Sequence, residues 1–184
     1  MVGLSQREHT QCIVGSRLLQ FTIILVLDCI RAATGCLLEH PDEPEDDASL
    51  ASIWRLKALR AMLALLPMRK LRVWQGQFGA KSPKPTALMV HGLRTLEERL
   101  EQQRSSEMPA TRSIGRTAEG TFATSELKEY PPRLCLSIAH AVVDGFKEAS
   151  AGSLDPEEIE LGDDAFLQAA QSCLLYTSPS PRDA

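Results

Sequence analysis

Two short stretches of the chain carry the side chains best suited to bind a ligand or to react with one. The first is Glu39-His40-Pro41, in which the Glu39 carboxylate can act as an acid, a base or a hydrogen-bond acceptor from a nucleobase edge. The second is the loop at 76–85, where Lys81 and Lys84 lie beside backbone amides that suit phosphate. Taken alone, each stretch also fits ordinary surface structure, as a loop carboxylate before a proline turn and as a solvated hairpin loop.

The rest of the chain lacks the usual patterns of catalysis and metal binding. It contains no Gly-x-Ser-x-Gly, no His-Glu-x-x-His and no Walker loop. The acidic stretch 42–47 lacks the spacing of a calcium loop, so we expect a solvated loop and no metal site. Trp54 and Trp74 are interpreted as core residues, and His91 and His140 as isolated core or surface histidines.

The two stretches must be positioned by a series of helices and strands. An apolar segment at 13–33 predicts a mostly buried helix that stops at Gly35. The short apolar run that follows, at 36–41, predicts a buried parallel strand with Glu39 near its carboxyl end, where open α/β sheets bind ligands. The further predicted elements are a helix at 53–66, strands at 71–74 and 86–90, a helix at 93–103 and a helix beginning at Pro131 or Pro132, with Leu134, Ile138, Val142 and Phe146 on one face.

This order of elements predicts an α/β fold. The loop at 76–85 is too short for a crossover connection, so the strands on either side of it should form a final antiparallel pair. We therefore expect a partial three-layer, Rossmann-like sheet in residues 1–104, about four strands short of a complete one. A turn-rich linker at 105–130 and a helical segment at 131–172, with a short helix near 163–171, should follow.

Composition limits the class of protein. The chain has 184 residues, enough for one domain, and with 43% apolar and 24% charged residues it is not wholly disordered. Lys and Arg number 20 against 24 Asp and Glu, a net charge of −4, which excludes a globally basic nucleic-acid-binding protein but allows a local basic groove. Five widely spaced cysteines predict buried, reduced thiols and an intracellular protein, cytoplasmic or nuclear. Asp28 and Arg31 interrupt the apolar N-terminal region, so we expect no membrane span.

Taken together, the two stretches resemble a known family. DNA cytosine-5 methyltransferases carry Glu-Asn-Val or Glu-Asn-Pro at a strand end, and later a Tyr-Gly-Val-Pro-Gln-x-Arg-x-Arg loop that runs into a strand ending in Gly. Glu39-His40-Pro41 is similar to the first motif, and residues 78–86 with the strand up to Gly92 are similar to the second. The resemblance covers residues 36–92, and the preceding helix would belong to it. Segments at 38–41, 75–76, 84–86 and 127–135 also resemble a divergent group found in protist retroelement-associated polyproteins.

The resemblance implies roles for individual residues. Glu39 would contact a flipped cytosine and assist its protonation in a complete parent protein. Lys84, with Lys81, would face phosphate, and Gly79 and Thr86 belong to the same phosphate-binding loop. The family's methyl donor, S-adenosylmethionine, would serve only a complete parent, because this chain contains neither the Pro-Cys-Gln nucleophile loop nor the Phe-x-Gly-x-Gly donor loop.

Three hypotheses for function follow. The first is a fragment of a methyltransferase-like or retroelement polyprotein domain, which is not competent for catalysis without the N-terminal half of its domain. The second is a non-catalytic module that binds nucleic acid, such as DNA, or a partner protein through the Lys81/Lys84 loop and the helix that begins at Pro131. The third is a reading frame without selected function. Residues 173–183 resemble a translated sequencing-library adapter, and we expect 173–184 to be an artefactual tail.

Overall fold

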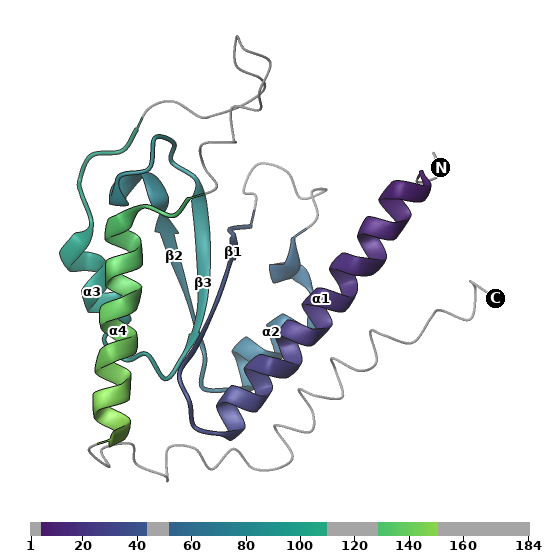
Figure 1. Ribbon diagram of the computed structural model, residues 1–184, viewed down its shortest axis with the longest axis horizontal. Helices are drawn as coiled ribbons and strands as arrows, with labels where there is room; N and C mark the ends of the chain where they lie inside the picture. The colour runs from purple at the N-terminus through teal and green to yellow at the C-terminus, as the bar shows by residue number, and fades with distance from the viewer. Residues whose placement is uncertain (1–4, 44–51, 110–128, 151–184) are drawn as a thin grey trace.

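The computed structural model of the chain describes residues 5–43, 52–109 and 129–150 (Figure 1). The expected short helix near 163–171, most of the expected linker and the adapter-like tail lie outside these residues. The elements, in chain order, are α1 (Gln6–Arg31), β1 (Cys36–Pro41), the 3-10 helix η1 (Ile53–Arg55), α2 (Lys57–Leu65), β2 (Arg69–Trp74), the 3-10 helix η2 (Gln75–Phe78), β3 (Pro85–His91), α3 (Leu96–Gln103) and α4 (Pro132–Ser150).

The three strands form one antiparallel sheet in the order β1-β3-β2. The predicted antiparallel pairing of β2 with β3 is confirmed, with Leu71 opposite Leu88. The prediction of a parallel strand at 36–41 is wrong, because β1 pairs antiparallel with β3, placing Leu38 opposite Met89. The third strand, β3, lies between β1 and β2 and runs antiparallel to both of them.

Helices cover both faces of this sheet (Figure 1). Successive residues of a strand point to opposite faces, and β3 shows this clearly. Ala87 and Met89 pack in a core with α1 and α2, whereas Leu88 and Val90 pack in a second core with α3 and α4. The fold is therefore mixed helix and strand, with a central strand that is buried on both sides.

The helix α1 begins earlier than predicted and is less buried. Ser5 and Glu8 form a capping box, in which the Glu8 amide donates to Ser5 Oγ and the Ser5 amide donates to the Glu8 carboxylate. One face is buried on the sheet, at Ile23, Val26, Leu27 and Ile30. The opposite face is exposed, so the expectation of a mostly buried helix is wrong. By length and composition alone α1 is also a candidate membrane span, with a mean hydropathy of 1.9, though such a helix near an N-terminus is weak evidence.

The helix α4 is confirmed where predicted, with one change in its buried face. Leu134 is fully buried and Ile138 and Val142 pack against the same core, but Phe146 is 71% exposed. Ser137, which is polar, is also on the buried face, and its hydroxyl donates to the Arg99 carbonyl at 3.0 Å. The contact holds α4 against α3.

The cysteines of the described residues are free, but they are not uniformly buried. Cys12 and Cys135 are exposed, contrary to expectation, and Cys29 and Cys36 are partly buried. Burial, followed by the neighbouring Cys29 thiol, raises the pKa of Cys36 to about 12. Cys36 is therefore a neutral thiol at physiological pH and a poor nucleophile.

Candidate nucleic-acid interface

The two stretches singled out in the sequence lie at one end of the sheet, which we call the loop end. At this end β1 and β2 finish and β3 begins, so that Pro41 is opposite Thr86 and Trp74 is opposite Pro85. Antiparallel pairing brings the last residues of the outer strands beside the first residues of the central one. Glu39 and Lys84 are thereby held on the same end of one rigid sheet.

A residue not assigned a role in the sequence, Tyr130, connects these two side chains. Its hydroxyl donates a hydrogen bond of 2.5 Å to Glu39 Oε2. Lys84 Nζ lies 5.3 Å from the centroid of its ring, within the range at which a cation is attracted to an aromatic face. Tyr130 is 42% exposed, so part of its ring remains available to a ligand. The one signal in the sequence was an aromatic residue directly before a Pro-Pro pair that begins a helix.

The environment of Tyr130 keeps its hydroxyl protonated. Desolvation, followed by the hydrogen bond to Glu39 and the negative charge of that carboxylate, raises the pKa of Tyr130 to about 12. At neutral pH the phenol is therefore a hydrogen-bond donor, and Glu39 accepts from it with one of its two carboxylate oxygens.

Beneath Lys84 the loop is held by a buried hydrogen-bond pair. Gln75 Nε2 donates to Thr86 Oγ1 at 3.0 Å, and the Gln75 amide donates to the Lys84 carbonyl at 3.2 Å. Both Gln75 and Thr86 are buried, and Thr86 is fully so. Thr86 therefore supports the loop from inside and does not offer its hydroxyl at the surface.

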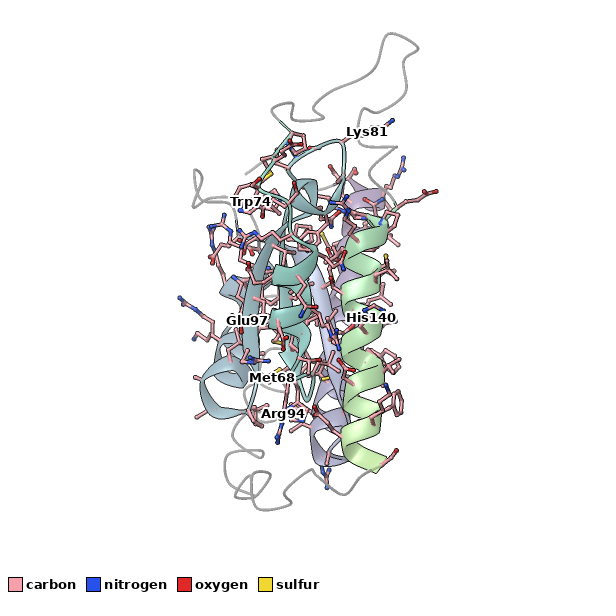
Figure 2. All side chains as sticks on the ribbon, turned by 90° about the vertical axis from the view of Figure 1, so that its left-hand side faces the viewer. Met68, Trp74, Lys81, Arg94, Glu97 and His140 are labelled. Carbon is pink, nitrogen blue, oxygen red and sulfur yellow. The ribbon has the colours of Figure 1, made fainter. Side chains whose placement is uncertain are left out.

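Gly79 and Lys81, the other residues of the predicted phosphate site, are both exposed. Gly79 has a φ of +102°, a left-handed conformation that glycine adopts without strain. The expectation of freed backbone amides here is wrong, because the Gly79 amide donates to the Gly76 carbonyl and the Ala80 amide to the Gln75 carbonyl. Figure 2 shows Lys81 at the loop end, with its side chain directed away from the sheet.

An open groove of about 610 Å³ runs between this loop and the start of α4. Its lining includes Gly79, Pro132 and Arg133, together with the acidic Glu107. The first turn of α4 contains no acidic residue, so the positive end of its helix dipole and the Arg133 guanidinium favour an anion, whereas the Glu107 carboxylate opposes one. The groove itself therefore carries one charge of each sign, and the net positive charge of the loop comes from Lys81 and Lys84.

The other face of the loop end is occupied by internal contacts. The Asp42 carboxylate binds both Lys70 Nζ, at 3.2 Å, and Arg72 Nε, at 2.5 Å. Trp54 is buried as predicted, and its Nε1 donates to the Pro41 carbonyl at 2.8 Å. Trp74 is partly exposed, with the Arg72 guanidinium 5.1 Å from its ring centroid. These contacts fix the strand ends and do not point to a ligand.

A cavity of about 520 Å³ lies at the opposite end of the sheet, against Gly35, His91 and Phe146. His91 is 7% exposed, as expected of a core histidine, and its Nδ1 lies 2.9 Å from the Pro67 carbonyl. Arg69, also on the wall, donates to the Leu93 carbonyl and pairs with Glu97. The polar groups at this end thus have internal partners, and we place the candidate site at the loop end.

The described residues contain no group of three His, Cys, Asp or Glu side chains that would hold a metal ion. The loop end presents an aromatic ring between a carboxylate and an ammonium group, beside an open groove. Comparisons of this chain with models of protein families, with curated proteins and with solved structures gave no match.

Proposed function

We propose that this chain binds nucleic acid at its loop end and that it does not transfer methyl groups by itself. The observation that carries the proposal is the position of Tyr130, whose hydroxyl contacts Glu39 while Lys84 lies over its ring. A carboxylate, an aromatic ring and a cation in one place are the groups that contact a base edge, a base face and a phosphate.

Each group has a matching partner in nucleic acid. The Glu39 carboxylate would accept a hydrogen bond from an exocyclic amine such as that of cytosine. The exposed part of the Tyr130 ring would stack on a base, and Lys84, Lys81 and Arg133 would contact phosphates. Because the base must be splayed out to reach both Glu39 and Tyr130, single-stranded nucleic acid is the expected ligand.

The proposed ancestry is a Rossmann-like, three-layer methyltransferase domain. It is supported by the antiparallel β2–β3 pair expected of that family, and by the place of Glu39-His40-Pro41 and Lys84 at one end of the sheet. The outer edge of β1 has no strand partner among the described residues, so further strands of such a sheet could pair there. A complete parent would then use Glu39 at its active site.

The loop end does not fit the family's methyl donor. The glycine-containing loop at Gly79 uses its backbone amides for hydrogen bonds within the loop, and the chain has no Phe-x-Gly-x-Gly or Pro-Cys-Gln motif. We therefore assign no methyl-transfer step to this chain. Its proposed activity is recognition alone.

A protein partner is the second candidate, and one observation favours it. The outer face of α4 exposes three large apolar side chains, at Leu136, Val143 and Phe146. Exposed apolar patches commonly mark protein interfaces. Under this alternative, substitutions that place a charge on the outer face of α4 would weaken binding of the partner, and substitutions in the Lys84 loop would not.

The test is the affinity of the full chain for a fluorescein-labelled single-stranded DNA, measured by fluorescence anisotropy at several salt concentrations. Lys84→Met should weaken binding roughly tenfold and reduce the slope of log K against log salt by about 1. Lys84→Arg keeps the charge and makes the same backbone demand at φ +36°, so it should bind like the unmodified chain.

The matched control is Lys147→Met, because Lys147 is an exposed lysine about 22 Å further along α4 than Pro132 at 1.5 Å per residue. This variant should change neither the affinity nor the salt slope. Equal binding by Lys84→Met and the unmodified chain would overturn the proposal. Loss of binding in Lys147→Met of the same size as in Lys84→Met would also overturn it, because it would indicate general charge attraction.

A further inference from the structure

The outer face of α1 carries a regular apolar stripe that nothing in the described structure covers. Its members recur at intervals of four, three and four residues, which is the heptad spacing of a helix-pairing surface. Each of them is between 47% and 62% exposed. The stripe, which we call the outer stripe, consists of Val14, Leu18, Phe21 and Leu25.

A second stripe with the same spacing lies on the opposite face of α1 and is already used. It packs against the sheet in the core shared with α2, together with Leu27. It consists of Leu19, Ile23, Val26 and Ile30. In this helix, therefore, such spacing marks a packing surface: the stripe of Leu19, Ile23, Val26 and Ile30 (the inner stripe) is buried against α2 and the sheet, and the outer stripe has no partner among the described residues.

Charged residues at the two ends of the outer stripe identify the partner and its direction. The same spacing continues through the polar Gln11 to Arg7 at the N-terminal end and reaches Asp28 at the C-terminal end, and all three are exposed. If two copies of α1 lie antiparallel, Val14 faces Leu25 and Leu18 faces Phe21 of the other copy. Asp28 then faces Gln11 of the other copy and lies about 6 Å from Arg7 along the helix axis at 1.5 Å per residue, whereas a parallel pair would place Arg7 beside Arg7 and Asp28 beside Asp28.

We propose that two copies of this chain associate through the outer stripes of their α1 helices, in antiparallel orientation. A second copy fits because the apolar centre of the stripe has a cation, Arg7, towards one end and an anion, Asp28, at the other. Two such stripes bring opposite charges near each other only when the helices are antiparallel. This dimer is independent of the nucleic-acid site, which lies on the end of the sheet rather than on α1.

A membrane is a poorer partner for the same surface. Crossing a bilayer would expose the whole circumference of α1 to lipid, and this requires Ile23, Val26 and Ile30 to leave the core they share with α2 and the sheet. It would also place Arg17 and Asp28 within or next to the apolar span. A helix pairing leaves the inner stripe in place.

The first test is sedimentation equilibrium of the full chain. The unmodified chain should be dimeric at micromolar concentration, and Leu18→Glu should raise the dimer dissociation constant at least about 100-fold by burying a charge. Leu18 is exposed in the single chain, so the variant should keep its circular-dichroism spectrum. Phe146→Glu, an apolar-to-acidic change at an exposed residue of α4, is the matched control and should leave the dimer intact.

The second test is a charge exchange that reports the direction of pairing. Arg7→Glu should weaken the dimer by placing two carboxylates together, and the double variant Arg7→Glu/Asp28→Arg should restore it. In addition, the double variant Val14→Cys/Leu25→Cys, with Cys12 replaced by Ser, should form a covalent dimer on mild oxidation. The two introduced thiols are about 16 Å apart along one helix, too far for a disulfide within a chain.

The proposal would be overturned by a monomeric unmodified chain, or by a dimer that Leu18→Glu leaves unchanged. It would equally be overturned if Val14→Cys alone cross-linked as efficiently as the double variant, since that indicates parallel helices. Binding of a monomeric chain to phosphatidylcholine vesicles, abolished by Leu18→Glu, would assign the outer stripe to a membrane instead.

Discussion

Tyr130 donates a hydrogen bond of 2.5 Å to Glu39, and this contact joins the start of α4 to the end of β1. The bond links two segments that are 91 residues apart in the chain. It fixes the orientation of the Glu39 carboxylate while leaving its second oxygen for a ligand. The hydrogen bond therefore stabilises the loop end, and it also orients a carboxylate that we propose contacts nucleic acid.

The ionisation of Tyr130 is the first prediction. The folded-state pKa of about 12 lies above the ordinary value of about 10 for tyrosine, so the folded chain holds this proton more tightly than the unfolded chain. The contribution of Tyr130 to stability should be complete below pH about 10 and should be lost as the pH rises towards about 12. Phenolate absorbance in a Tyr176→Phe background measures the pKa directly, since the chain has 2 tyrosines.

Glu39→Gln provides the control for that titration. It removes the negative charge and keeps a hydrogen-bond acceptor, so the pKa of Tyr130 should fall towards its ordinary value while the desolvation that acts on the phenol remains. A Tyr130 that titrates at its ordinary pKa in the unmodified chain would contradict the hydrogen bond to Glu39.

The second prediction concerns the buried pair beneath the loop. Thr86→Val keeps the shape of the side chain but leaves Gln75 Nε2 without its acceptor, so the free energy of unfolding should fall by about 1–3 kcal/mol. Thr86→Ser keeps the hydroxyl and loses one buried methyl group, with an expected cost of about 0.8 kcal/mol. Urea denaturation measures both values, and the slope of the unfolding free energy against urea concentration should be the same in both variants and in the unmodified chain. If Thr86→Val is as stable as Thr86→Ser, the Gln75–Thr86 bond does not support the loop.

The third prediction compares two glycines of positive φ. Gly92 has a φ of +69°, and a Cβ there would lie 2.9 Å from the Gly35 Cα. Gly79 has a φ of +102°, and a Cβ there would meet no atom within 4 Å. Gly79→Ala should therefore cost about 1–2 kcal/mol for backbone strain alone, and Gly92→Ala should cost at least about 1 kcal/mol more.

Thermal or urea unfolding of these two variants decides the comparison. Equal losses would mean that the close approach of Gly35 and Gly92, which sets the turn after α1 against the end of β3, does not constrain the chain. A larger loss at Gly79 would contradict the described conformation of the loop.

The sequence predicted the elements of the fold better than their pairing. Apolar spacing located the helices and the strands because it depends on residues near one another in the chain. The antiparallel β2–β3 pair was predictable because the connecting loop is short. The partner of β1 was not, because an apolar run such as Cys36-Leu37-Leu38 is the same whether its neighbour is parallel or antiparallel.

The candidate site shows the same limit. Glu39 and Lys84 were recognisable from their local motifs, but Tyr130 was not, since its role arises from a contact across the fold. The resemblance places Thr86 in the phosphate-binding loop, and only the structure shows its hydroxyl turned inward to Gln75. Phe146 continues an apolar helical pattern, yet its side chain is largely exposed.

The most direct test of nucleic-acid binding at the loop end is a two-dimensional amide NMR titration of the labelled full chain with a short cytosine-containing single-stranded DNA. We predict chemical-shift changes concentrated at residues 39–41, 79–86 and 130–133, with none at the C-terminal end of α4. Saturable changes that are confined instead to α1 or to Leu136, Val143 and Phe146, or the absence of any change, would contradict the account.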